Sequence, residues 1–291
     1  MNKVLDIISK IGCCFLSILL FLILCIYLGI DMTTKTINKT NVSNIIKELD
    51  AEILLSNNAM STIDDLYQVA DENNVDRSVV DGVINSIEFK QQLGEYYGEI
   101  VDGILYNKPV KELTATKVIT TIESVLERTA NSLGYTITSD QRESIMSAVE
   151  EKVPKVIEKI PSYNQATKDL KVQDIKAIQT LFSNDSKTVL IVIMLIIVGL
   201  MALIRWSSYR FAIWSGTPTI LAGGLFAIIG ALTGTVLASY AQESLSMSMS
   251  KILQNNIFNT ITHLGLIVVL VGAVQIVYYV LMNRSYKQER I

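Results

Sequence analysis

The side chains that could do chemistry inside the long apolar stretches of this chain are few, and none of them is charged. The most polar is Gln275, and the third stretch, 211–238, adds the hydroxyls of Thr219, Thr233 and Thr235. In hydrocarbon such groups form hydrogen bonds between helices or line a hydrated path. Proton relays and ion pathways usually contain Asp, Glu, Lys or Arg, which these stretches lack. We therefore favour hydrogen bonding between helices for Gln275.

Catalytic groups are also scarce in the polar part of the chain. The sole histidine, His263, lies outside the polar region 31–186, so that region cannot build a histidine-centred metal site or a Ser-His-Asp triad. Adjacent carboxylates such as Asp71–Glu72 are typical of a solvated helix face. A glycine-rich phosphate loop and a basic patch with aromatic residues are both absent. We expect no enzyme activity, no cofactor and no nucleic-acid partner.

The run DENNVD, residues 71–76, packs oxygen ligands densely enough to suggest calcium. The calcium loop of an EF-hand needs Asp or Asn at its fifth position and Gly at its sixth. This stretch offers Val75 and Asp76 there. We predict a polar turn between helices.

Four uncharged stretches determine the architecture. About 20 apolar residues cross the hydrocarbon layer as a helix, so we predict transmembrane helices at 11–30, 187–205, 211–238 and 263–282. The first is longer than the apolar core of a signal peptide, and we expect an uncleaved anchor. Between the third and fourth, residues 239–262 have the pattern of an external amphipathic helix. The predicted fold is all-α.

The region 31–186 has helical periodicity almost throughout, and we predict a bundle of six or seven helices inserted between the first two transmembrane helices. Its capping-box spacings are Ser61–Asp64, Ser78–Asp81 and Thr138–Gln141. Pro154 falls inside an apolar stripe and is expected to kink or shorten its helix.

Charge predicts which side each part faces. The short pieces 1–10, 205–210 and 283–291 carry seven basic residues against two acidic ones, whereas the region 31–186 is acidic in net. Since basic residues in short loops set orientation, both termini are expected to be cytoplasmic and residues 31–186 extracytoplasmic. The residues that set this topology are Lys3, Lys10, Arg205, Arg210, Arg284, Lys287 and Arg290.

Glycine is common in the third apolar stretch although it weakens helices in water by about 1 kcal/mol relative to alanine. In lipid, small residues let two backbones approach closely. We predict two packing rows with two neighbours: the second helix, and either the fourth helix or another subunit. The rows are Gly230, Gly234 and Ala238, and Gly223, Ala227, Ala231 and Thr235, with Gly265 and Gly272 on the fourth helix.

In topology the chain resembles the FtsX class of ABC-transporter-associated permeases, which also place a large outer domain between a first helix and three more. That class carries a charged inner turn with a Gly-Ala after its second helix, through which it engages the ATPase. The corresponding stretch here, RWSSYRFAIWSGTP, is shorter and lacks that motif. The resemblance concerns topology alone and implies a permease-like subunit.

These features predict a multi-pass plasma-membrane protein, of a bacterium by its Ile-, Lys- and Asn-rich usage. We expect a non-catalytic accessory, sensor or scaffold subunit whose partners are the bilayer and either itself or another membrane protein. The alternatives are an oligomeric channel or small-solute transporter with a pore lined by the third helix, and the permease-like subunit.

Overall fold

The computed structural model describes residues 3–49, 64, 66–205, 209–244 and 253–288, and these residues contain helices and no strand. They form two compact units, which are described separately. The long-helix unit comprises Met1–Thr36 and Thr180–Ile291, and the bundle unit comprises Ile37–Gln179. The prediction of an all-α chain is confirmed for the described residues.

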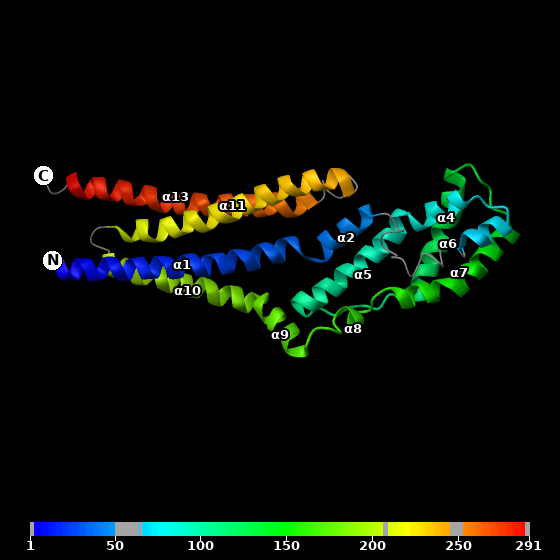
Figure 1. Cartoon of the computed structure of the whole chain (residues 1–291), viewed down its shortest axis with the longest axis horizontal. Helices are drawn as coiled ribbons and strands as arrows, with labels where there is room; N and C mark the ends of the chain where they lie inside the picture. Colours follow the sequence, from blue (N-terminus) through cyan, green and yellow to red (C-terminus); the bar gives the residue numbers. More distant parts are fainter. Residues whose placement is uncertain (1–2, 50–63, 65, 206–208, 245–252, 289–291) are drawn as a thin grey trace. The chain divides into compact units, whose positions relative to one another are not determined.

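The long-helix unit contains four helices long and apolar enough to cross a membrane, as predicted. Helix α1 runs beside α10 and α11, and α11 runs beside α13 over most of its length (Figure 1). A short π-helical segment, η2, leads into α13. The bounds are α1 (Lys3–Thr36), α10 (Asn184–Arg205), α11 (Phe211–Ser244), η2 (Gln254–Phe258) and α13 (Asn259–Gln288).

The segment 239–262, expected as a separate external helix, is divided among other elements. Helix α11 continues through Ser244, and helical backbone is present again from Leu253 through η2 into α13. Residues 245–252 lie outside the described part of the chain. The turn residues 206–208, the predicted capping residue Ser61, and Arg290 also lie outside it.

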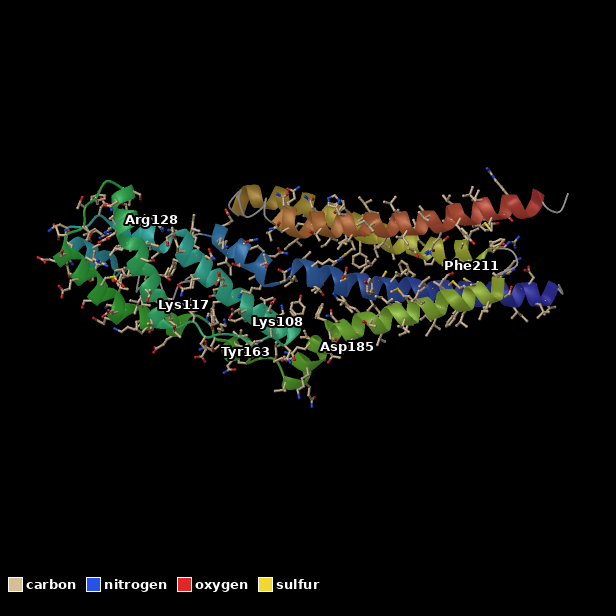
Figure 2. All side chains as sticks on the ribbon, turned by 180° about the vertical axis from the view of Figure 1, so that it is seen from behind. Lys108, Lys117, Arg128, Tyr163, Asp185 and Phe211 are labelled. Carbon is tan, nitrogen blue, oxygen red and sulfur yellow. The ribbon has the colours of Figure 1, made fainter. Side chains whose placement is uncertain are left out.

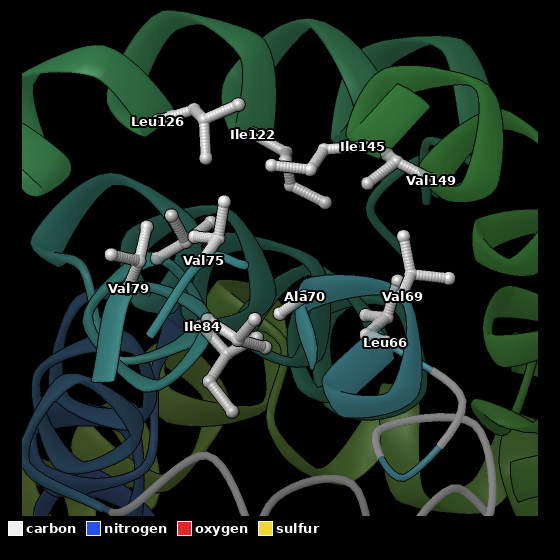
Figure 3. A pocket seen from close by; sticks show the side chains of 12 residues that line it. Leu66, Val69, Ala70, Val75, Val79, Ile84, Ile122, Leu126, Ile145 and Val149 are labelled. Carbon is white, nitrogen blue, oxygen red and sulfur yellow. The ribbon is translucent and has the colours of Figure 1, made fainter. Parts of the chain in front are cut away.

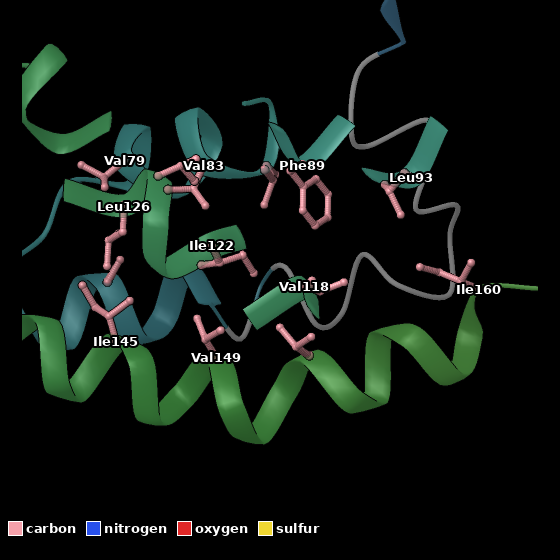
Figure 4. Packing of buried hydrophobic residues seen from close by; sticks show 14 of the residues in the cluster. Val79, Val83, Phe89, Leu93, Val118, Ile122, Leu126, Ile145, Val149 and Ile160 are labelled. Atoms are coloured by element: carbon pink, nitrogen blue, oxygen red, sulfur yellow. The ribbon is translucent and has the colours of Figure 1, made fainter. Parts of the chain in front are cut away.

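The bundle unit consists of helices around one apolar core, in which Leu93, Val79 and Val125 are almost wholly enclosed (Figure 4). Apolar side chains at the 3.6-residue period form the inner faces of α5, α6 and α7. The helices are α2 (Lys39–Glu48), α4 (Arg77–Ile84), α5 (Ile87–Tyr106), α6 (Ala115–Ser132), α7 (Ser139–Lys159), α8 (Tyr163–Ala166) and α9 (Val172–Leu181), the last of which crosses the boundary between the units.

Two predicted helix starts have different outcomes. At α7 the capping box is confirmed, because Thr138 accepts a hydrogen bond from the Gln141 N–H and Gln141 accepts one from the Thr138 N–H. At α4 the predicted Ser78–Asp81 box is wrong. Asp76 caps that helix, and its carboxylate accepts the Ser78 N–H at 2.8 Å. Helix α7 continues past Pro154 to Lys159, so the proline does not end it.

The run 71–76 forms the predicted turn, with Asn74 in the left-handed region at φ 55°. Its carboxylates bind partners of this chain. The Arg77 guanidinium pairs with Asp71 and holds the pKa of that carboxyl below its usual value. Hydrogen bonds from Ser78 and from the Tyr135 hydroxyl lower the pKa of Asp76. Both carboxylates are thus engaged in holding the α4 start.

A pair of glycines that the sequence analysis overlooked brings α2 against α5. Gly94 and Gly98 are four residues apart, so they share a helix face. A methyl group on Gly98 would stand 2.7 Å from the Lys39 carbonyl oxygen, and one on Gly94 would stand 2.8 Å from the Ser43 carbonyl oxygen. The Gly-x-x-x-Gly spacing is present in the sequence, outside the apolar stretches.

Two carboxylates, one buried and one partly buried, anchor the start of α2 at the same contact. Asp102 is buried, and its Oδ1 accepts the Lys39 N–H at 3.0 Å. The Lys39 ammonium lies 2.8 Å from Glu99, and their hydrogen bond raises the pKa of Lys39. Burial alone would raise the pKa of Glu99, but hydrogen bonds from Lys39 and from the Lys111 N–H outweigh it and lower that pKa.

The close contact predicts that Gly98→Val destabilises the bundle unit. Backbone atoms of α2 stand where the valine would go, and overpacking of this kind costs about 1–3 kcal/mol. The measurement is hydrogen–deuterium exchange across 39–48 in the full chain, with thermal unfolding. Gln91→Val is the control, because Gln91 is exposed on the same helix. Equal exchange in the two variants would refute the close packing.

Candidate functional site

The candidate site predicted from sequence is the packing surface of α11, and α13 covers much of it. Three pairs lie in antiparallel register: Gly216 beside Gly272, Gly223 beside Gly265, and Gly230 beside Phe258 and Thr262. A methyl group on Gly223 would stand 2.6 Å from the Gly265 carbonyl oxygen and 2.7 Å from the Val269 nitrogen. The two backbones are therefore in contact at the glycines.

The contacting glycines repeat every seven residues, at 216, 223 and 230 on α11 and at 265 and 272 on α13. A seven-residue repeat keeps the same side of a helix, called its seam, facing its partner over several turns, as in two helices that wind around each other in a left-handed supercoil. The sequence analysis used a four-residue spacing and missed Gly216. The seven-residue repeat was the signal that could have found it.

Residues from both predicted rows lie against the same helix. Gly223, Ala227 and Gly230 face α13, and Gly234 stands against the Phe258 side chain. Ala231 differs, because it is exposed. The side chains of Thr235 and Ala238 lie outside the described part of the structure.

The second neighbour of α11 is chiefly α1. Ala222 is fully buried and packs with Leu28 and Met32 of α1, and Phe226 lies at the edge of this cluster. Helix α10 reaches α11 through a smaller cluster around Met201. The seven-residue seam therefore covers one side of α11, while the side that contains Ala222 packs on α1.

The polar side chains at depth are joined by hydrogen bonds within the chain. The Ser215 hydroxyl lies 3.0 Å from Gln275 Oε1, which links α11 to α13. Thr219 is buried, and its hydroxyl donates to the Ser215 carbonyl at 2.8 Å. Thr233 is exposed and does not join this group. The structure thus brings together Gln275 and Thr219 through Ser215, a residue that the sequence analysis did not select.

A hydrogen bond from α1 compensates for a proline inside α11. Pro218 has no N–H, so it cannot donate to the carbonyl of Trp214, four residues earlier in the helix. The Ser17 hydroxyl of α1 donates to that carbonyl at 2.7 Å. In hydrocarbon a backbone carbonyl without a partner is costly, so Ser17 both satisfies α11 and positions α1 against it.

Two ion pairs join α1 to α10 near the ends of the apolar stretches. Asp6 lies 2.8 Å from the Arg205 guanidinium and 2.7 Å from the Lys10 ammonium. At the other end, Asp31 lies 3.4 Å from the Lys187 ammonium. Lys187 and Arg205 are 18 residues apart on α10, which corresponds to roughly 27 Å at 1.5 Å per residue. That span matches a hydrocarbon layer about 30 Å thick.

Arg205 was selected as a charge that sets topology, and its environment differs from that of a free loop residue. Its side chain is only 5% exposed and is paired with Asp6, an acidic residue that the sequence analysis counted but did not assign a role. Arg210 and Arg284 are exposed, as expected of such charges. The side chains of Lys3 and Lys287 are not among those described.

The outer surface of the long-helix unit is apolar along most of its length, whereas oxygen and nitrogen tips cover the bundle unit (Figure 2). Leu203, Phe15 and Val274 each expose about two thirds or more of their surface. Exposed apolar side chains in such numbers are typical of helices that contact lipid. In this unit Ser215 and Thr219 are buried, whereas many aliphatic side chains are exposed.

The core of the bundle unit contains a small cavity of about 40 Å³ (Figure 3). Its lining is aliphatic, and residues such as Val79, Ile122 and Val149 point into it. A cavity of this size could hold a water molecule, but an apolar lining gives the water no hydrogen-bond partner. Among the described residues, no group of three metal-binding side chains occurs.

Comparison of the chain with protein-family models, with curated proteins and with solved structures found no match.

The α11–α13 seam predicts different effects for adjacent glycines. Gly223→Val forces a side chain into the Gly265 backbone and is expected to cost about 1–3 kcal/mol. Gly224→Val adds the same residue one position along, where no atom lies within 4 Å, and is expected to be nearly neutral. The measurement is unfolding of the detergent-solubilised protein by SDS titration. Equal losses in the two variants would show that helix propensity, not packing, sets the effect.

The Ser17–Trp214 hydrogen bond predicts energetic coupling to Pro218. Ser17→Ala is expected to cost about 0.6–2 kcal/mol, in the range of interhelical hydrogen bonds in membranes. In a Pro218→Ala background the residue at 218 supplies its own N–H to the Trp214 carbonyl, so Ser17→Ala should cost much less. A double-mutant cycle on the same unfolding measurement gives the coupling. Additive effects would contradict this account of Ser17.

Proposed function

We propose that the chain is a non-catalytic subunit of the plasma membrane, with four membrane-spanning helices, cytoplasmic termini and an extracytoplasmic bundle unit. In this proposal it acts as an accessory, sensor or scaffold protein that presents the bundle unit to a partner. The partner is a second copy or another membrane protein.

The observation that carries the proposal is the inward pairing of polar groups in the long-helix unit. Ser17, Ser215 and Thr219 each donate to an acceptor within the chain. The exposed surface of the long-helix unit is apolar along most of its length (Figure 2). Helices packed in this way can anchor the protein in the membrane, and they require no water-filled path. The acidic balance of 31–186 and the basic short pieces support the orientation.

The channel alternative has weaker support. A pore lined by α11 would need several hydroxyls on one open face. Thr219 instead donates to its own helix. Thr217 and Thr233 are exposed, but they are 16 residues apart and so lie roughly 160° from each other around the helix. We therefore keep the subunit proposal.

The experiment uses single cysteines in a background without Cys13, Cys14 and Cys25. Lys117 is exposed on α6, and Lys117→Cys should react with a membrane-impermeant maleimide photocrosslinker in intact cells. Illumination should then give an adduct heavier than one chain. Arg284→Cys, exposed on α13, is the matched control and should react only after the membrane is opened.

Two outcomes would contradict the proposal. Labelling of Arg284→Cys but not of Lys117→Cys in intact cells would invert the orientation. Labelling as expected without any heavier adduct, together with ion flux through liposomes that contain the full chain, would favour the channel.

A further inference from the structure

Helix α9 (Val172–Leu181) buries none of its residues. Val172 is 68% exposed and Leu181 is 46% exposed. Ile175 and Ile178 are only partly covered. A ten-residue helix with four aliphatic side chains in contact with solvent would be poorly stabilised in water, since short helices depend on packing of an apolar face.

The side chains of α9 separate into two faces. Ile175, Ile178 and Phe182 follow one another at spacings of three and four residues and so share a face. Gln173, Lys176 and Thr180 share the opposite face at the same spacings. Two aliphatic side chains, Val172 and Leu181, flank the first face. The helix is amphipathic, and its polar face carries a lysine.

Helix α2 provides the comparison. It begins three residues after the end of α1, so it also adjoins a predicted span. Yet α2 buries Ser43 and Ile46 in the bundle unit, and α5 holds its first turn through Asp102. In α9, the Gln179 side chain donates to the Gly103 carbonyl of α5 at 3.0 Å. A helix that adjoins a predicted span, such as α2, can therefore still bury side chains in the bundle unit.

Chain continuity limits how far α9 can be from a membrane. Two residues separate Leu181 from Asn184, the first residue of α10, and extended chain covers at most about 10 Å over three steps. Four more residues along α10 lead to Thr188, where the uncharged stretch begins, a rise of about 6 Å. Leu181 is therefore within roughly 16 Å of the hydrocarbon layer. The headgroup region begins closer still.

We propose that α9 lies on the phospholipid bilayer, with Ile175 and Ile178 inserted at the boundary between headgroups and acyl chains. The face that contains Ile175 and Ile178 then contacts the same lipid surface that α10 enters a few residues later. Lys176 and Thr180 then face water and the headgroups, as is usual for amphipathic helices at this depth. The inference rests on the proposed membrane location of α10.

The test reads depth from a fluorophore on single cysteines in the cysteine-free full chain. The chain is reconstituted in phosphatidylcholine–phosphatidylglycerol vesicles, with or without lipid that carries a nitroxide quencher on its acyl chain. Ile175→Cys and Ile178→Cys should be quenched at least about twofold more than Gln173→Cys, which lies on the opposite face of the same helix. Leu195→Cys, on the exposed side of α10, reports membrane insertion.

The outcomes separate the two proposals. No quenching at Leu195→Cys would overturn the membrane location itself. Quenching at Leu195→Cys with equal signals at Ile178→Cys and Gln173→Cys would overturn the α9 proposal alone. A blue-shifted but unquenched fluorophore at Ile178→Cys would also overturn it, because protein would then cover that face.

Discussion

The four long helices are apolar enough to cross a membrane, and one constraint applies to helices of this kind: in hydrocarbon, each backbone polar group needs a partner within the protein. Helix α11 shows the consequence most clearly. Pro218 removes one intrahelical hydrogen bond, and the Ser17 hydroxyl of α1 supplies the missing donor to the Trp214 carbonyl. Ser215 likewise pairs with Gln275 of α13. The same groups that satisfy the constraint also fix which helices are neighbours.

Close backbone contact supplies the rest of the association between α11 and α13. Lipid gives apolar helices little hydrophobic reason to meet, so dispersion forces must act over many atoms at short range. Glycines at 216, 223 and 230 allow this on one helix, and Gly265 and Gly272 allow it on the other. The ion pairs of α1 with α10 lie near the ends of the apolar stretches.

The bundle unit has the opposite distribution of side chains, with apolar groups inside and charged groups outside. Its core is aliphatic, its surface is charged, and burial of apolar area drives the packing. It nonetheless uses a glycine pair, Gly94 and Gly98, where α2 crosses α5. The buried Asp102 then joins α2 to α5 by accepting the Lys39 N–H. Close approach and carboxylate capping therefore occur in water-facing helices as well.

The sequence by itself determined the elements: four apolar helices of membrane length, a helical region between the first two, and caps such as Thr138. These follow from local periodicity, length and side-chain chemistry. Only the tertiary structure decided the partners, because periodicity identifies a face and not the residue opposite it. That is why Gly216, Ser17 and the Asp6–Arg205 pair were missed, and why both glycine rows were assigned to separate neighbours although they meet one helix. Pairings between residues nearly 200 positions apart are set by packing in three dimensions, which spacing along one chain does not encode.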